Sequence, residues 1–217
     1  MLIKYLRRPV RFDYLNKWLN KKHFKVLDVG CGNHSPSVTK KYFPEIDYYG
    51  LDMVKNYNSD EEDLRCMEKF YEVDLAKSYN LDIIPDIFFD GLILSHVIEH
   101  LENGEKVILD LLHKLNTNGI IYIEFPSPHS VYLPRMKGTL NFYDDPSHVK
   151  LYNVKKLNNL LKENGCIILK SGIRHSLKKI ILLPLYAVSS LFSFGNISSS
   201  VFWDITGFAS YIIAIKK

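Results

Sequence analysis

The chain has 217 residues, of which 47% are hydrophobic and 24% are charged. These values are ordinary for a globular protein and allow one sizeable α/β domain. The formal net charge of +4 is too small to indicate nucleic-acid binding. The three cysteines are isolated and show no zinc-ligand spacing, and basic residues interrupt any apolar stretch at the N-terminus. These features predict a cytoplasmic protein without disulfides.

The first half of the chain alternates predicted helices and strands. The expected elements are a helix over about 10–20, a strand over 24–29, a helix after residue 36, a strand over 47–51, a helix from 59 to about 68, and a strand over 70–73. Ser59 and Glu62 have the spacing of a capping box, with Ser59 as N-cap. Pro44 stops the second helix.

The second half continues the alternation and then changes character. The expected elements are strands over 90–94 and 120–125, helices over about 104–115 and 154–163, and two last strands over 166–171 and 210–215. Gly119 is expected to act as a C-cap for the helix before it. The apolar, Ser-rich stretch 177–208 is interpreted as a cap or lid. The alternation predicts an α/β fold with a doubly wound, Rossmann-like sheet and right-handed crossovers.

Acidic residues and glycines stand where predicted strands end. The first strand carries Asp28 and leads into Gly30 and Gly32, and the next two strands end at Asp52 and Asp74. In a doubly wound sheet these ends converge on one crevice, where ligands bind. Glycines allow a ligand to lie against bare backbone, and a carboxylate after the second strand can accept both ribose hydroxyls. The pattern therefore predicts a nucleoside site.

Two cofactor classes fit such a loop. A dinucleotide fingerprint requires a third glycine, so that the pyrophosphate lies on a helix N-terminus. That glycine is absent here, and Asp28 would repel a pyrophosphate while it could organise the loop around an ammonium group. This contrast favours S-adenosylmethionine.

Five segments resemble, in order, the motifs of class I S-adenosylmethionine-dependent methyltransferases: VLDVGCG at 26–32, YGLD at 49–52, VDL at 73–75, FDGLILSHVIEHL at 89–101 and LNTNGIIYIE at 115–124. The resemblance covers residues 24–125 and continues more weakly to 165. It implies one domain over 1–217 with a mostly parallel seven-stranded sheet and an antiparallel last strand. It also implies a cofactor-binding core over 24–125 and a substrate side over 126–217.

The resemblance implies S-adenosylmethionine as cofactor and S-adenosylhomocysteine as product. Gly30 and Gly32 would lie against the methionyl part, Asp52 on the ribose and Asp74 near the adenine. The full set of expected cofactor residues is Asp28, Gly30, Cys31, Gly32, Asp52, Met53, Asp74, Leu75, Ser95 and His96. Two departures are His34, where a third glycine is common, and the 116–119 turn.

A second set of side chains comprises His96, Glu99 and His100, with His148 later in the chain. The set resembles the Glu-x-x-Glu-His element of RNA 2′-O-methyltransferases and of metal-assisted ubiquinone-pathway O-methyltransferases. His96 replaces the first glutamate of that element, so a hydrogen-bonding role in the crevice floor is favoured. Substrate or base roles come next and metal binding last, and no metal is therefore predicted.

The histidine-rich segments also resemble bacterial methyltransferases of polysaccharide and small-molecule pathways. O-methylation of a small-molecule or glycan hydroxyl is therefore the favoured function, with His148, then His96 and His129, as candidate bases. A metal-assisted RNA 2′-O-methyltransferase and a non-catalytic cofactor-binding scaffold are the alternatives. A monomer and a homodimer both remain open, as does peripheral membrane contact through 177–208.

Overall fold

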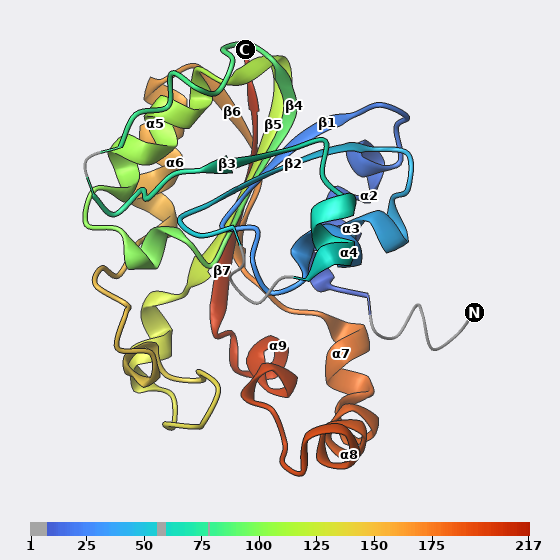
Figure 1. Ribbon diagram of the computed structural model, residues 1–217. Coiled ribbons are helices and arrows are strands. Elements are labelled where there is room, and N and C mark those ends of the chain that lie inside the picture. Colours follow the sequence, from blue (N-terminus) through green and yellow to red (C-terminus); the bar gives the residue numbers. More distant parts are fainter. Residues whose placement is uncertain (1–7, 56–59, 78) are drawn as a thin grey trace. The chain divides into compact units, whose positions relative to one another are not determined.

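The computed structural model describes residues 8–55, 60–77 and 79–217 (Figure 1). The described chain forms two compact units. The first comprises the residues up to Leu94 together with 108–121 and 216–217, and the second comprises 95–107 and 122–215.

One seven-stranded sheet runs through the fold, in the order β3-β2-β1-β4-β5-β7-β6. Its strands are β1 (Lys25–Val29), β2 (Asp47–Asp52), β3 (Lys69–Glu72), β4 (Phe89–Ser95), β5 (Leu115–Pro126), β6 (Cys166–Ile173) and β7 (Ala209–Lys216). Strand β1 pairs in parallel with both β2 and β4, and β2 pairs in parallel with β3. The inner strands are apolar and buried, as expected for a parallel sheet covered on both faces.

The last strand runs against its neighbours. The Ser127 amide, just after β5, donates to the Phe208 carbonyl just before β7 at 2.7 Å, and the Arg174 amide after β6 donates to Ala209 at 2.7 Å. The ends of β5 and β6 therefore lie beside the start of β7, as Figure 1 shows. This arrangement confirms the predicted Rossmann-like α/β fold with an antiparallel last strand.

The helices largely follow the expected order. They are α2 (Val10–Leu19), α3 (Ser35–Tyr42), α4 (Glu61–Arg65), α5 (Gly104–Leu112), α6 (Val154–Glu163), α7 (Leu177–Ile181), α8 (Leu183–Phe194) and α9 (Trp203–Thr206). Short 3₁₀ turns are η1 (Ile98–His100), η2 (Pro128–Tyr132), η3 (Phe142–Asp144) and η4 (Ser199–Val201). The prediction for α6 is confirmed, and its N-cap Asn153 accepts hydrogen bonds from the Lys155 and Lys156 amides.

Two details of the sequence prediction are wrong. The capping box of α4 is formed by Asp60 and Asp63, one residue later than expected, and α4 ends at Arg65. Ser59 lies outside the described residues. Gly119 caps no helix: α5 ends at Leu112 and Gly119 lies within β5. A Cβ there would approach the Leu115 side chain to 2.7 Å, so close packing rather than capping explains the glycine.

The predicted cap is a helical insertion between β6 and β7, and comprises α7, α8, η4 and α9 (Figure 1). Within the second unit, the Trp203 indole donates to the Thr139 carbonyl at 2.8 Å, and the Ser199 hydroxyl donates to the Gly138 carbonyl. Phe202 and Trp203 pack on a small core with Leu140 and Phe208. Across residues 8–55, 60–77 and 79–217, no helix has both the length and the apolar character needed to span a membrane.

In the first unit, the buried side chain of Asp63 joins α4 to the start of α3. Its carboxylate accepts hydrogen bonds from the amides of Asp60 and Ser37 at 3.0 and 3.2 Å, and lies 2.7 Å from Nδ1 of His34. Burial alone would raise the pKa of Asp63, but hydrogen bonds from Ser37, Asp60 and His34 outweigh burial and lower this pKa to about 2.

We expect Asp63→Ala to lower the free energy of unfolding by about 2–3 kcal/mol at neutral pH, because hydrogen bonds to a charged group are lost. A depressed pKa stabilises the fold above the ordinary value of 3.8, and this contribution is lost as the pH falls through about 2. Urea unfolding of wild type and variant should therefore converge in acid. Glu61→Ala, on the exposed first turn of α4, is the matched control. An equal loss in both variants would contradict the role of Asp63.

Candidate functional site

In the first unit, the turn after β1 is shaped by its glycines and by β2. Gly30 has φ +71°, a conformation that glycine adopts without strain. The amides of Gly30 and Cys31 donate to the Leu51 carbonyl at 2.7 and 3.3 Å. The Cys31 side chain is buried, and burial raises the pKa of its thiol. Cys31 is therefore an inert packing residue of the turn, while the Gly30 backbone is exposed.

Asp52 closes the same turn from the end of β2. One carboxylate oxygen accepts the Gly32 amide at 3.0 Å, and the other accepts the Met53 amide at 2.7 Å. The side chain is half-buried, and each carboxylate oxygen can accept more than one hydrogen bond. The sequence prediction that the strand ends bring Gly32 and Asp52 together is confirmed by this contact. The carboxylate has the acceptor capacity that two ribose hydroxyls would need.

Asp28 lies beneath the turn and is fully buried. Its Oδ2 accepts hydrogen bonds from the hydroxyls of Ser35 and Tyr48 at 2.6 and 2.5 Å. Burial raises the pKa of Asp28, against the lowering effect of the nearby Arg11 charge. The Arg11 guanidinium also donates to the Ser35 hydroxyl at 3.0 Å. Asp28 thus fixes the segment between β1 and α3 from within, rather than offering an exposed carboxylate to a ligand.

The position where a third glycine is common has a left-handed backbone. Asn33 and His34 have φ +56° and +58°, which explains why related turns favour glycine there. The hydrogen bond between His34 and Asp63 holds this conformation. His34 therefore replaces the glycine at a cost in backbone strain that Asp63 offsets.

The remaining expected cofactor residues of this unit lie near the ends of β2 and β3. The Val73 amide donates to the Asp52 carbonyl at 2.9 Å, which brings the two strand ends together. Asp74 accepts the Ala76 amide at 3.0 Å and pairs with Lys77 at 2.9 Å, and the Lys77 hydrogen bond lowers the pKa of Asp74. Leu75 is buried, whereas Met53 is exposed.

In the second unit, His96 follows Ser95 at the end of β4, and its backbone and both of its ring nitrogens have partners. Its φ is +58°, and its amide donates to the Glu124 carbonyl at 2.8 Å. The ring nitrogens lie 3.0 Å from carboxylate oxygens of Glu99 and Glu124. Burial alone would lower the pKa of His96, but both carboxylates raise it to about 9. His96 is therefore an imidazolium at neutral pH, which disfavours its predicted role as a base.

Glu124 is the centre of this buried network. It accepts Nη1 of Arg174 at 2.8 Å and the Tyr122 hydroxyl. Burial alone would raise the pKa of Glu124, but the Arg174 guanidinium and His96 hold it well below its usual value. Arg174 also donates to the Asp204 carboxylate of α9 at 3.2 Å. Burial raises the pKa of Asp204, although the Arg174 charge acts to lower it.

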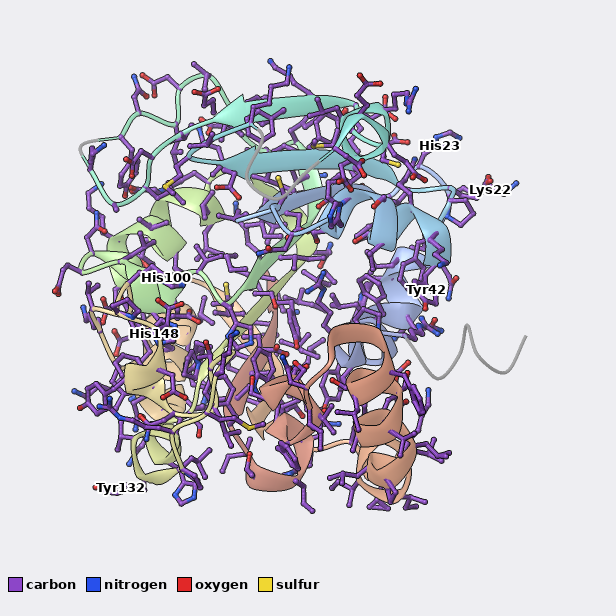
Figure 2. All side chains as sticks on the ribbon, turned by 60° about the horizontal axis from the view of Figure 1, so that its bottom comes forward. Lys22, His23, Tyr42, His100, Tyr132 and His148 are labelled. Atoms are coloured by element: carbon purple, nitrogen blue, oxygen red, sulfur yellow. The ribbon has the colours of Figure 1, made fainter. Side chains whose placement is uncertain are left out.

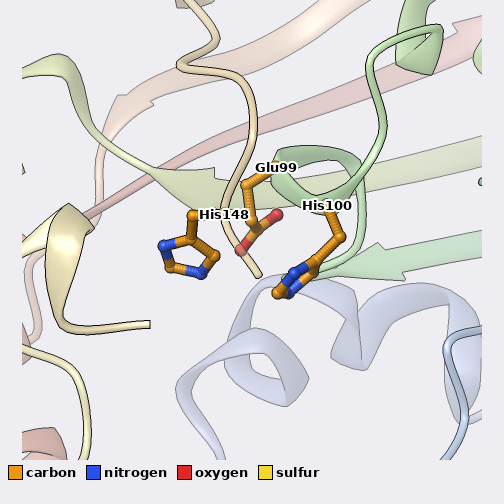
Figure 3. A group of neighbouring side chains, drawn as sticks. All are labelled: Glu99, His100 and His148. Atoms are coloured by element: carbon orange, nitrogen blue, oxygen red, sulfur yellow. The ribbon is translucent and has the colours of Figure 1, made fainter. Parts of the chain in front are cut away.

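The other histidines divide into two groups. His100 and His148 come from different segments and lie side by side, with ring centroids 4.9 Å apart (Figure 2). Glu99 joins them: one ligand atom from each of these three residues lies within 4.8 Å of the others (Figure 3). His129 is exposed on η2, where its ring lies 6.2 Å from that of Tyr132. Within the predicted four-residue set, His96 contacts Glu99 through Nδ1, while its Nε2 contacts Glu124.

Several residues of these sites were not predicted from sequence. They are Arg11, Ser35, Tyr48, Asp63, Glu124, Arg174 and Asp204. A signal for Glu124 was available, because a carboxylate within the apolar strand 120–125 requires a buried partner. The partners of Asp28 gave no such signal, since a serine or a tyrosine near a strand end is common.

Comparison with known proteins agrees with this geometry. The sequence matches the family described as a methyltransferase domain over residues 3–171. It is 31% identical over 126 residues to an uncharacterised protein of Methanocaldococcus jannaschii, across 54% of this chain and 32% of that protein. It is 28% identical over 123 residues to a ubiquinone biosynthesis O-methyltransferase of Rickettsia bellii, across 53% of this chain and 49% of that protein.

These matches span between a third and a half of the length of the curated relatives. Among solved structures, a SAM-dependent methyltransferase from Archaeoglobus fulgidus has a TM-score of 0.59 at 20% identity, and the match covers 99% of this chain and 93% of that one. Because the family match extends over most of the sequence, the chain belongs to the methyltransferase-domain family.

Proposed function

We propose that this protein binds S-adenosylmethionine at the turn after β1 and transfers its methyl group to a hydroxyl of a small molecule or glycan. The observation that carries the proposal is the Asp52 carboxylate, which closes the Gly30–Gly32 turn and keeps acceptor capacity for a ribose. The resemblance to class I methyltransferases supports a placement of the exposed Gly30 backbone against the methionyl part of the cofactor and of Asp74 near its adenine.

The cofactor supplies an activated methyl group as a sulfonium. The protein then has to align the acceptor with that methyl, and alignment alone can contribute several kcal/mol. A hydroxyl acceptor must also lose its proton near the transition state. Histidine is suited to this task at neutral pH.

His148 is the histidine that best fits the role of base. Its Nδ1 lies 2.7 Å from the Phe142 carbonyl, which fixes the ring and leaves Nε2 as the acceptor nitrogen. His96 lacks such a nitrogen, because both of its nitrogens face carboxylates. His129 is exposed on η2, where its ring lies 6.2 Å from that of Tyr132. The similarity to the Rickettsia O-methyltransferase supports oxygen as the acceptor atom.

The Asp52 proposal is tested by calorimetric titration with S-adenosylhomocysteine. Wild type should bind, and Asp52→Asn should bind roughly 10- to 100-fold more weakly, because hydrogen bonds to a charged group contribute about 1.5–3 kcal/mol. Asp47→Asn, at the opposite end of the same strand, is the control and should bind like wild type. Absence of binding by wild type would contradict the proposed function. Equal affinities of wild type and Asp52→Asn would show that Asp52 does not contact the nucleoside.

We also propose that the cap contacts an anionic membrane surface peripherally, and that the protein works in the cytoplasm as a monomer or a homodimer. Leu177 and Ile181 of α7 and Phe192 of α8 are 73%, 72% and 86% exposed. No aspartate or glutamate occurs between Glu163 and Asp204. Apolar side chains without nearby acids suit the boundary of an anionic bilayer.

Vesicle sedimentation tests this contact. The protein should sediment with phosphatidylglycerol-containing vesicles, and Ile181→Glu and Phe192→Glu should each weaken the binding several-fold. Ile83→Glu alters an exposed apolar residue of the first unit and should have no effect. Binding that is equal in all three variants would place the contact elsewhere.

A further inference from the structure

A cavity of the first unit lies where β1 begins, at the other end of that strand from the Gly30–Gly32 turn. Its volume is about 350 Å³, which falls in the range of small-molecule sites in proteins. Its walls come from three segments: the end of α2 with the turn that follows, the start of β4, and the first half of β5. None of its lining residues is among the expected cofactor residues, so the cavity is separate from the site described above.

The Asp90 carboxylate ties together the three strands that meet at this cavity. Asp90 is the second residue of β4. One of its oxygens accepts the Lys25 amide at the start of β1, and the other accepts the side-chain amide of Asn116 in β5, both at 2.9 Å. Because each oxygen has a donor from the protein, Asp90 holds the strand ends in place before a ligand binds.

Two residues with a left-handed backbone line the cavity. His23 and Asn118 have φ +53° and +63°, a conformation that is unusual for residues other than glycine. The His23 amide donates to the Glu45 carbonyl at 2.7 Å, and Nδ1 lies 3.3 Å from a carboxylate oxygen of Asp47. These contacts fix the turn, from which the side chains of Lys22 and His23 extend outward (Figure 2). Backbone strain of this kind clusters at functional sites.

The exposed side chains of the cavity are mainly hydrogen-bond donors. Lys21 and Lys22 come from the turn after α2, and Thr117 and Asn118 come from β5. Among the described residues, no carboxylate oxygen lies within 4.0 Å of the Lys21 ammonium. The Lys22 ammonium lies 3.8 Å from Glu45, but these side chains are 76% and 58% exposed. Such a surface pair contributes little, so Lys22 can exchange it for another anion.

Trp18 gives the cavity a flat apolar surface beside these cations. Its ring is half-buried and belongs to the lining. Within the described part of the chain, its indole N–H has no hydrogen-bond acceptor, so it is a further donor for a ligand. Two ammonium groups and several neutral donors next to an aromatic ring suit an anion that is attached to a flat group.

We propose that this cavity binds a small phosphate ester that carries a flat ring, with the phosphate at Lys21 and Lys22 and the ring against Trp18. A phosphate monoester carries close to two negative charges at neutral pH, which matches the two ammonium groups. The five residues of β1 separate the cavity from the Gly30–Gly32 turn by roughly 17 Å. That distance is too long for methyl transfer, so the ligand would be an effector rather than a methyl acceptor.

Titration of the full-length protein with phenyl phosphate, followed through the two tryptophan indole signals in ¹⁵N–¹H spectra, tests the site. Trp18→Phe assigns the two signals. We expect a saturable shift of the Trp18 signal and no shift of the Trp203 signal. Lys21→Gln and Lys22→Gln should each weaken the binding by roughly fivefold or more, because a charged hydrogen-bond donor is lost. Lys41→Gln, which alters an exposed lysine of α3 outside the cavity, should bind like wild type.

Two further ligands separate the parts of the proposal. Phenol lacks the phosphate and should give no saturable shift, and inorganic phosphate lacks the ring and should bind more weakly than phenyl phosphate. A shift that does not saturate, or equal affinities in Lys21→Gln and Lys41→Gln, would overturn the site. Equal affinities of inorganic phosphate and phenyl phosphate would overturn the contact with Trp18.

The outcome is independent of the proposed function, because no step of the titration uses the nucleoside cofactor. A protein that binds S-adenosylhomocysteine but not phenyl phosphate rejects only the cavity as a phosphate site. A protein that binds phenyl phosphate but not S-adenosylhomocysteine supports the cavity and contradicts the proposed function. Thermal melting of each lysine variant checks that the fold is kept.

Discussion

The buried contact of Glu124 with His96 and Arg174 is the interaction on which the second unit depends. Taking these charges out of water is costly, and the cost is offset only because each carboxylate oxygen and ring nitrogen has a partner. The contact fixes His96 in a left-handed backbone conformation directly after β4. It also brings Glu99 into place, since one oxygen of Glu99 is used by His96.

A buried carboxylate plays a comparable part in the first unit. Asp28 accepts hydrogen bonds from Ser35 and Tyr48, and so joins the segment after β1 to both α3 and β2. In the turn, the Gly30 backbone is exposed and the Asp52 side chain is half-buried.

The sequence was sufficient for the alternation of strands and helices and for the turn that joins Gly32 to Asp52, because these follow from hydrophobic periodicity and from glycines at strand ends. The antiparallel last strand followed from the family resemblance. It was insufficient where two residue types compete for one role. Asp60 rather than Ser59 caps α4, since both are good N-caps and only Asp63 completes the box. Likewise, the sequence spacing grouped His96 with His100, and the choice of Glu124 as a partner of His96 depends on the tertiary pairing of β4 with β5.

The salt bridge between Arg174 and Asp204 has a consequence for how such proteins diversify. Arg174 directly follows β6, and Asp204 lies in α9, the last helix of the cap, so the bridge ties the start of the insertion to its last helix. A loop whose stems are fixed can change in length and composition while the sheet beneath it keeps its register. The cap is therefore an interchangeable module. The segment between these two residues is the place where segments from related chains can be grafted without altering the sheet.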